Sequence, residues 1–109
     1  MRYIPSIATE VPVSPDGTLS RVLYRDERLR IVGFSFDAGQ ELTEHTAAIP
    51  VILQTMTGVL DVTASGETVR LLPGAWLTLA ASEPHTVVAR EPSVLLLTML
   101  KEGLDPDVA

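Results

Sequence analysis

The regular spacing of turn signals limits the fold of this chain more than any other feature of its sequence. Small groups of residues that favour turns, most of them containing glycine or proline, recur at intervals of about ten residues. In chain order they are Pro15-Asp16-Gly17, Arg25-Asp26-Glu27, Ala38-Gly39, Thr57-Gly58, Ser65-Gly66-Glu67, Pro73-Gly74, Glu83-Pro84 and Glu91-Pro92. Such spacing is typical of many short strands joined by tight turns, so it predicts an all-β chain.

The segments between these turns have the composition of β-strands. They are rich in Val, Ile, Leu, Thr and aromatic residues, and include 30–36, 51–56, 59–64 and 94–100. The main alternative is a helix from Leu19 to Ile31. Its apolar face fails halfway, because Asp26 and Arg30 occupy the continuation of that face. We therefore expect two strands there, 19–24 and 29–36, joined by a charged turn.

The 109 residues fit a single domain, 1–109, with one hydrophobic core. A chain of about nine or ten short strands must close into a barrel or a sandwich to protect its edges, and a jelly-roll barrel is the simplest solution. Residues 1–18 form an N-terminal arm whose apolar groups between Tyr3 and Val13 are expected to lie at a homodimer interface. Residues 104–109 are expected to be frayed.

Charge and composition exclude several classes of partner and site. The formal net charge of −6 would repel nucleic acid and anionic lipid head groups. No apolar run approaches the roughly 20 residues that span a bilayer, so a cytoplasmic protein without membrane contact is expected. Cysteine is absent, so any metal would depend on oxygen ligands and on two histidines, His45 and His85.

Those two histidines lie in two runs of residues that match a known pattern. The first run has Gly39, then His45, then a strand over 51–56 that ends before Gly58. The second has Pro73-Gly74, Trp76 and Glu83-Pro84-His85. Over about the last two-thirds of its length the chain thereby resembles the small single-domain cupins, the RmlC-like family of cupin 2 type conserved barrels. The resemblance implies a double-stranded β-helix, or jelly-roll, barrel in which His45 and His85 lie on adjacent strands and face the interior.

The resemblance also implies a depleted metal site. Ala47 stands where the family commonly has its second histidine, and Val51 stands where it has glutamate. Glu41 is too far along the strand from His45, by roughly 13 Å, to share a metal with it, and Gln54 has the opposite strand parity to Val51. The remaining pair, His45 and His85, would bind Zn, Ni, Mn or Fe only weakly.

Three classes of function follow from this pattern. The first is a small-molecule-binding barrel with a largely apolar pocket, because small ligands favour apolar walls with a few placed polar groups. Its predicted apolar lining residues are Ala47, Val51, Leu53 and Val87, and His45 and His85 are the polar groups that would contact the ligand. The second is a metal-dependent oxygenase or isomerase with a two-histidine site completed by solvent or substrate. The third is a regulatory module that acts through its dimer surface. The sequence assigns no catalytic residue and leaves open whether the protein is an enzyme.

Two local predictions concern single residues. Gly58 is expected to have a positive φ that a β-branched residue would not adopt cheaply. Trp76 follows the turn at Pro73-Gly74 and is expected to pack in the core, although it would also suit a pocket wall or an interface.

Overall fold

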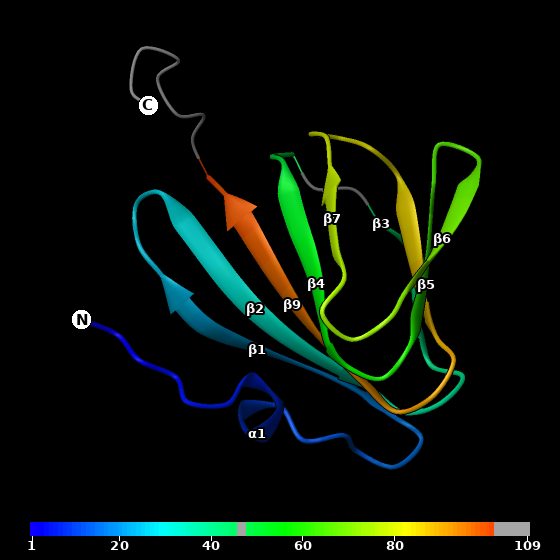
Figure 1. Cartoon of the computed structure of the whole chain (residues 1–109). Coiled ribbons are helices and arrows are strands. Elements are labelled where there is room, and N and C mark those ends of the chain that lie inside the picture. The colour runs from blue at the N-terminus through cyan, green and yellow to red at the C-terminus, as the bar shows by residue number, and fades with distance from the viewer. Residues whose placement is uncertain (46–47, 102–109) are drawn as a thin grey trace.

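The computed structural model describes residues 1–45 and 48–101, except for the side chains of residues 44 and 45. Within these residues the chain forms one short helix and nine strands (Figure 1). They are α1 (Ile7–Glu10), β1 (Thr18–Arg25), β2 (Leu29–Phe36), β3 (Glu41–His45), β4 (Val51–Thr57), β5 (Leu60–Ala64), β6 (Glu67–Leu71), β7 (Trp76–Leu79), β8 (His85–Ala89) and β9 (Ser93–Leu100). The segment 19–31 is two strands and a turn, as predicted. The tail expected to be frayed, 104–109, lies outside the described residues.

The strands form two antiparallel sheets that face each other. One sheet has the order β1-β2-β9-β4-β7 and the other has the order β3-β8-β5-β6. Because most strands pair with strands that are distant in sequence, the chain passes repeatedly from one sheet to the other (Figure 1). This arrangement confirms the prediction of an all-β double-stranded β-helix. No helix in the described part of the chain is long and apolar enough to cross a membrane.

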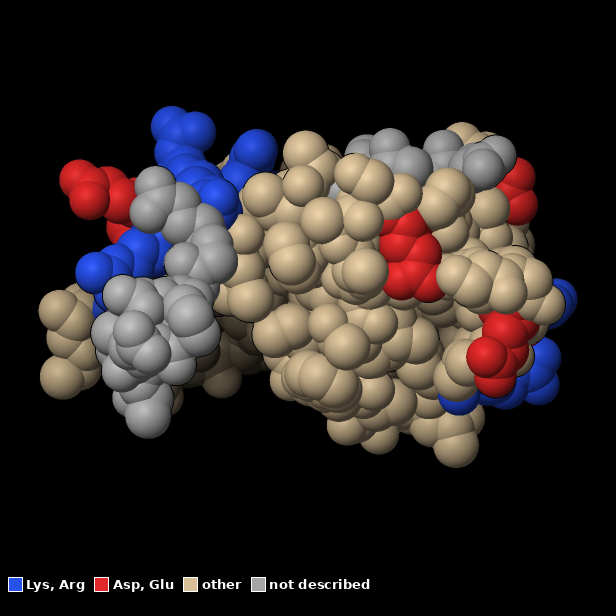
Figure 2. All heavy atoms as spheres, turned by 90° about the horizontal axis from the view of Figure 1, so that it is seen from above, with Lys and Arg blue, Asp and Glu red and all other residues tan. Residues whose placement is uncertain are grey.

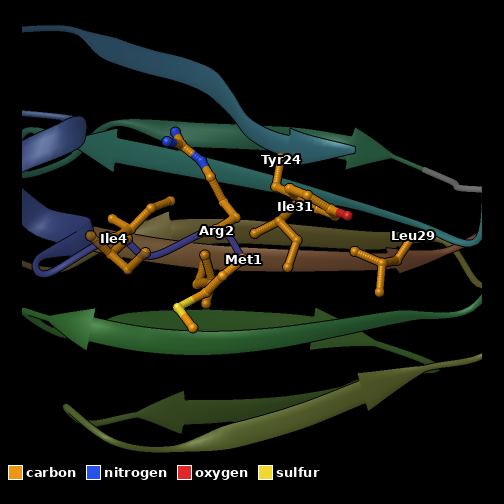
Figure 3. A pocket seen from close by; sticks show the side chains of 8 residues that line it. Met1, Arg2, Ile4, Tyr24, Leu29 and Ile31 are labelled. Atoms are coloured by element: carbon orange, nitrogen blue, oxygen red, sulfur yellow. The ribbon is translucent and has the colours of Figure 1, made fainter. Parts of the chain in front are cut away.

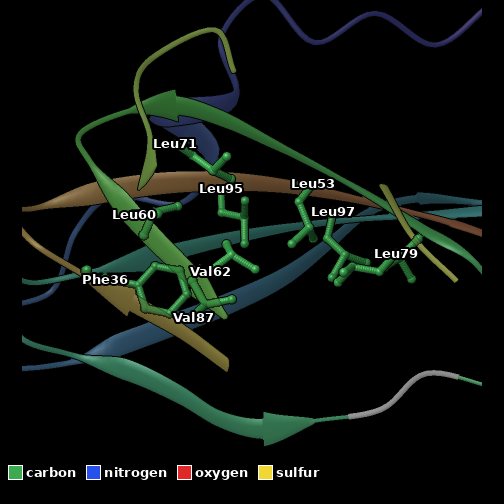
Figure 4. Close-up of a cluster of buried hydrophobic side chains, with 11 residues drawn as sticks. Phe36, Leu53, Leu60, Val62, Leu71, Leu79, Val87, Leu95 and Leu97 are labelled. Carbon is green, nitrogen blue, oxygen red and sulfur yellow. The ribbon is translucent and has the colours of Figure 1, made fainter. Parts of the chain in front are cut away.

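The hydrophobic core lies between the two sheets. On β4, alternate residues Val51, Leu53 and Thr55 are buried, because successive side chains of a strand point to opposite faces. The fully or nearly buried core side chains (Figure 4) are Phe36, Val51, Leu53, Leu60, Val62, Leu71, Leu79, Val87, Ala89, Leu95 and Leu97. Burial of each large side chain in such a cluster contributes about 1.5–3 kcal/mol.

The same alternation corrects the prediction for Trp76. Its neighbour Leu77 pairs with buried Leu53, whereas Trp76 pairs with Gln54 on the opposite face of the sheet. The indole is therefore 58% exposed and does not pack in the core. The prediction failed because it considered residue type without strand parity.

The N-terminal arm packs on the outer face of the five-stranded sheet. Val11 is completely buried there, and a Cβ on Gly33 would lie 3.2 Å from side-chain atoms of both Val11 and Leu23. The Ser35 hydroxyl donates a hydrogen bond of 3.1 Å to the carbonyl oxygen of Pro12. The second half of the arm thus contacts its own chain, while Tyr3 stays 75% exposed. The role of the arm at a dimer interface stays a prediction.

The turn between β4 and β5 depends on Gly58. Its φ is +80°, as predicted, and a Cβ there would overlap the Ser93 side chain and the Pro92 carbonyl oxygen. Ser93 Oγ instead accepts a hydrogen bond of 3.0 Å from the Val59 amide. Gly58 is therefore required both for its backbone conformation and for the close approach of the β8–β9 connection.

Candidate functional site

A cavity of about 350 Å³ opens between the two sheets at the end where β1 and β2 extend beyond the four-stranded sheet. Its lining comes from β1, β2, β4 and β9 of one sheet and from β8 of the other. The lining residues are Ser20, Val22, Arg30, Val32, Phe34, Val51, His85, Leu97 and Met99. Six of these nine side chains are hydrocarbon or thioether groups, so Ser20, Arg30 and His85 supply the polar chemistry.

Strand register explains why these residues meet. Arg30 pairs with Met99, which in turn pairs with Val51, so these three form one row across β2, β9 and β4. The next inward-facing row contains Val22, Val32 and Leu97. Residues two apart on a strand share a face, so both rows point into the barrel. The five-stranded sheet therefore builds a mostly apolar wall with one cation at its edge.

His85 begins β8 and is nearly buried, with 3% of its surface exposed. Its Nδ1 lies 3.0 Å from the carbonyl oxygen of Glu83. A carbonyl oxygen can only accept a hydrogen bond, so Nδ1 carries the proton and fixes the orientation of the ring. Nε2 is then the ring nitrogen without the proton.

The turn before His85 is held by a carboxylate. Glu83 accepts hydrogen bonds from the Ser65 hydroxyl at 2.6 Å and from the Ala80 amide at 3.0 Å. These bonds, the one from Ser65 foremost, lower the pKa of Glu83 below its usual value, and the nearby His85 lowers it further. The turn that carries His85 is thus tied to the β5–β6 turn across the edge of the sheet.

Arg30 is the polar residue that sequence reasoning missed. Its strand places Arg30, Val32, Phe34 and Phe36 on the inner face, and this alternation was visible in the sequence. Arg30 Nε is buried and has no hydrogen-bond partner in the described part of the chain. Arg25 is its direct cross-strand partner on β1. Arg30 is thus the one arginine of the cavity lining, and Arg25 lies beside it on the neighbouring strand, outside the lining.

The hairpin that presents these arginines is fixed by Asp26. Its carboxylate accepts hydrogen bonds from the amides of Arg28 at 2.8 Å and Leu29 at 3.0 Å, and from the Tyr24 hydroxyl at 2.8 Å. The bond from the Arg28 amide is the main reason why the pKa of Asp26 is lowered. The Asp26 carboxylate, which lies in the turn between Arg25 and Arg30, is therefore used to shape that turn.

The other predicted site residues fall into three groups. Val51 and His85 line the cavity. Leu53 and Val87 are buried in the adjoining core, at 0% and 1% exposure. Ala47 lies outside the described residues, as does the side chain of His45, although the backbone of His45 pairs directly with that of His85. The two histidine-bearing strands are thus adjacent, as predicted.

Comparison with solved structures identifies this architecture. The chain is similar to a cupin superfamily protein from Desulfitobacterium hafniense DCB-2, with 22% identity and a TM-score of 0.84 over 93% of this chain and 92% of the other. It is also similar to an RmlC-like cupin from Desulfovibrio desulfuricans, with 25% identity and a TM-score of 0.74 over 81% and 86%. This chain has the cupin fold.

The chain is also similar to a conserved protein of unknown function from Streptococcus pyogenes. The two share 29% identity and superpose with a TM-score of 0.84 over 95% of this chain and 91% of the other chain. No protein-family model and no curated protein matches the sequence. The comparisons therefore establish the barrel, and the chemistry of the cavity has to be read from its residues.

The metal site that the cupin motifs imply does not fit the described residues. No group of three or more His, Cys, Asp or Glu side chains placed to hold a metal occurs among them. Val51 offers only methyl groups where the family has glutamate, and Arg30 places a positive charge in the same cavity, which opposes a bound cation. Weak binding of a divalent metal by His45 and His85 stays a prediction. The described lining suits an organic ligand better than a metal ion.

A larger cavity of about 610 Å³ lies outside the barrel, beneath the N-terminal arm (Figure 3). It is lined by Met1, Arg2, Ile4, Ile7, Tyr24, Leu29, Ile31 and Leu96. The Tyr24 hydroxyl is already bonded to Asp26, and half of the wall belongs to the first seven residues of the chain. We take the barrel cavity as the candidate site, because its polar groups are held in place by strands.

Proposed function

We propose that this cupin binds a small organic molecule in the barrel cavity. The observation that carries the proposal is the lining itself, in which an apolar wall surrounds three polar side chains, Ser20, Arg30 and His85. Small-molecule sites are commonly concave and mostly apolar, with a few polar groups that orient the ligand, and volumes of about 300 Å³ and above are usual. The cavity of about 350 Å³ is at the lower end of that range, so a compact ligand is favoured.

The proposal is supported by the hydrogen bonds that hold the His85 ring and the hairpin that carries Arg30. His85 is fixed by its bond to the Glu83 carbonyl, and the β1–β2 hairpin is fixed by Asp26. Side chains that are already ordered lose little entropy when a ligand binds. For a metal-dependent oxygenase or isomerase, the described lining offers His85, and the described residues contain no group of three or more possible metal-ligand side chains. A cytoplasmic location and a homodimer, both expected from the sequence, belong to the proposal as accompanying predictions.

The test is to block the cavity at its mouth. Val22 lines the cavity and is 42% exposed, so Val22→Phe would add volume there with little strain on the core. Leu19→Phe is the matched control, because Leu19 is similarly exposed, at 39%, on the opposite face of the same strand. Compounds that raise the melting temperature of the wild type should raise that of Leu19→Phe equally and that of Val22→Phe much less. Equal shifts in all three proteins would mean that the compounds bind elsewhere.

A further inference from the structure

The guanidinium of Arg30 is in an unusual environment for a charged group. Its Nε is buried and lacks a hydrogen-bond partner in the described part of the chain. An arginine stays charged at every physiological pH, and a buried donor without a partner costs free energy. An acceptor that reached Arg30 Nε would therefore remove this cost.

Among the described residues, no acid forms an ion pair with Arg30. Its cross-strand partner is Arg25, and like charges directly opposite each other on a sheet repel. Asp26 is committed to two backbone amides and Tyr24. The ion pairs found in residues 1–45 and 48–101 involve the other arginines Arg21, Arg70 and Arg90. None of the nine cavity-lining side chains is acidic.

The open end of the barrel also has more basic than acidic side chains among the described residues. Arg25, Arg28, Arg30 and Lys101 are found there, beside Asp26 and Glu27 of the β1–β2 turn, in a chain with 14 acidic residues and eight basic ones. The Lys101 amide donates a hydrogen bond of 2.8 Å to the Arg28 carbonyl, which brings Lys101 to the same hairpin. Figure 2 shows most of the Lys and Arg side chains of this view gathered at its left end, with acidic side chains beside them, where Figure 1 places the β1–β2 hairpin. An anion approaching the cavity would therefore be attracted to its mouth, although the protein as a whole is acidic.

We propose that the ligand of this cavity carries a carboxylate group and that Arg30 binds it. This inference rests on the proposed small-molecule function. The planar guanidinium presents a fork of N–H donors that matches the two oxygens of a carboxylate. Arg30 is the only described lining side chain with a permanent charge, so a singly charged group is matched better than a doubly charged phosphate.

The register of the sheet predicts how such a ligand lies. Arg30 is in the outermost inward-facing row, with Met99 and Val51, and the row beneath contains Val32 and Leu97. A carboxylate on Arg30 would direct the rest of the ligand toward these apolar side chains. The expected ligand is thus a small organic acid with a hydrocarbon or aromatic body.

The test compares acids with their neutral amides. Hexanoate, benzoate and phenylacetate would each be titrated beside hexanamide, benzamide and phenylacetamide at constant ionic strength, with thermal melting and calorimetry as readouts. The proteins are the wild type, Arg30→Gln, Arg30→Lys and the control Arg28→Gln. Arg28 is exposed and does not line the cavity, so this control removes the same charge from the same hairpin.

We expect at least one acid to bind the wild type and Arg28→Gln at least tenfold more tightly than its amide. Arg30→Gln should lose that preference, and Arg30→Lys should keep only part of it, because lysine lacks the planar fork. Acid and amide binding equally well, or an acid preference that survives in Arg30→Gln, would overturn the carboxylate inference and leave small-molecule binding intact. No binding by any of the six compounds would count against both proposals.

Discussion

Two pairs of arginines in this barrel differ in what lies between them. On the outer face of the four-stranded sheet, Arg70 and Arg90 both bind Asp61. Arg70 Nε is 2.9 Å from Asp61 Oδ1, and Arg90 Nε is 2.6 Å from Asp61 Oδ2. At the open end of the five-stranded sheet, Arg25 and Arg30 are direct cross-strand partners, and no ion pair involves either of them within the described residues.

The difference separates a structural use of arginine from a binding use. Asp61 has only 8% of its side chain exposed, and the hydrogen bonds from Arg70 and then Arg90 lower its pKa to about 2. This carboxylate joins β5 to β6 and to the segment after β8, so we call Asp61, Arg70 and Arg90 the arginine clamp. The Arg25–Arg30 pair has no such internal acid, which is the condition expected of a site that receives an acid from outside.

The largest effect on the free energy of unfolding is expected at the turn between β4 and β5, where the chain enters the four-stranded sheet. Gly58→Val would combine a strained positive φ with overlap against Pro92 and Ser93. The Arg90 amide donates a hydrogen bond of 2.9 Å to the Val59 carbonyl, so a shifted turn would also displace the clamp. We expect a loss of at least about 3 kcal/mol in the free energy of unfolding, or no folded protein.

The control for this variant is Gly66→Ala. Gly66 has a φ of +75°, and a Cβ there would meet no atom within 4 Å. Only the backbone strain of about 1 kcal/mol should appear in urea denaturation of this control. Equal losses in Gly58→Val and Gly66→Ala would show that the contact with Ser93 is unimportant.

The second prediction concerns the charge of Asp61 at the centre of the arginine clamp. Asp61→Asn should lower the free energy of unfolding by about 1.5–3 kcal/mol, because hydrogen bonds to a charged group are lost or weakened on two arginines at once. Glu67→Gln is the matched control on the same hairpin, since Glu67 is exposed. Urea denaturation at pH 7 measures the free energy of unfolding of both variants. A loss no greater than that of Glu67→Gln would mean that the clamp is not structural.

The third prediction concerns acid. The pKa of Asp61 is lower in the folded chain than its usual value of 3.8, so its contribution to stability is full above about pH 4. That contribution should be lost as the pH falls toward about 2, where Asp61 takes up a proton in the folded state. Melting curves between pH 6 and 2 should therefore show a steeper acid loss for the wild type than for Asp61→Asn. Parallel curves would contradict the assignment.

The smallest effect on the free energy of unfolding is expected at Arg25 and Arg30. Arg30→Gln should leave the free energy of unfolding unchanged or raise it by less than about 1 kcal/mol, because it removes like-charge repulsion across β1 and β2. Arg28→Gln, which removes an exposed charge from the same turn, should have no measurable effect. A marked destabilisation by Arg30→Gln alone would show that Arg30 is structural, and the contrast with the clamp would disappear.

Much of the fold was predictable because its signals are local. The turn signals separate the strands, and the failed helical face at Asp26 correctly indicated a turn there. The positive φ of Gly58 was also predictable, because a glycine directly after a strand commonly closes a turn. Trp76 shows the limit of such reasoning, since its exposure depends on which face of β7 meets the core, and residue type alone does not decide that.

The candidate site was predictable only in part. The cupin motifs correctly paired the strands of His45 and His85, and alternation along β2 would have indicated that Arg30 points inward. Leu53 and Val87 were predicted as lining residues, but the packing of the second sheet places them in the core. Whether an inward residue reaches a cavity or the core depends on what covers it, and strand parity carries no information about that.

The sequence by itself determined the β-strands, their turns and the alternation of side chains between the two faces of each strand, because these follow from backbone sterics. Only the tertiary structure decided which charges meet. Asp61 and Arg90 are 29 residues apart and form a clamp, whereas Arg25 and Arg30 are brought together by one hairpin and form no ion pair within the described residues. The pairing of side chains on neighbouring strands is set by the long-range register of those strands. An arginine that forms an internal ion pair and one that is available to a ligand therefore look the same in the sequence.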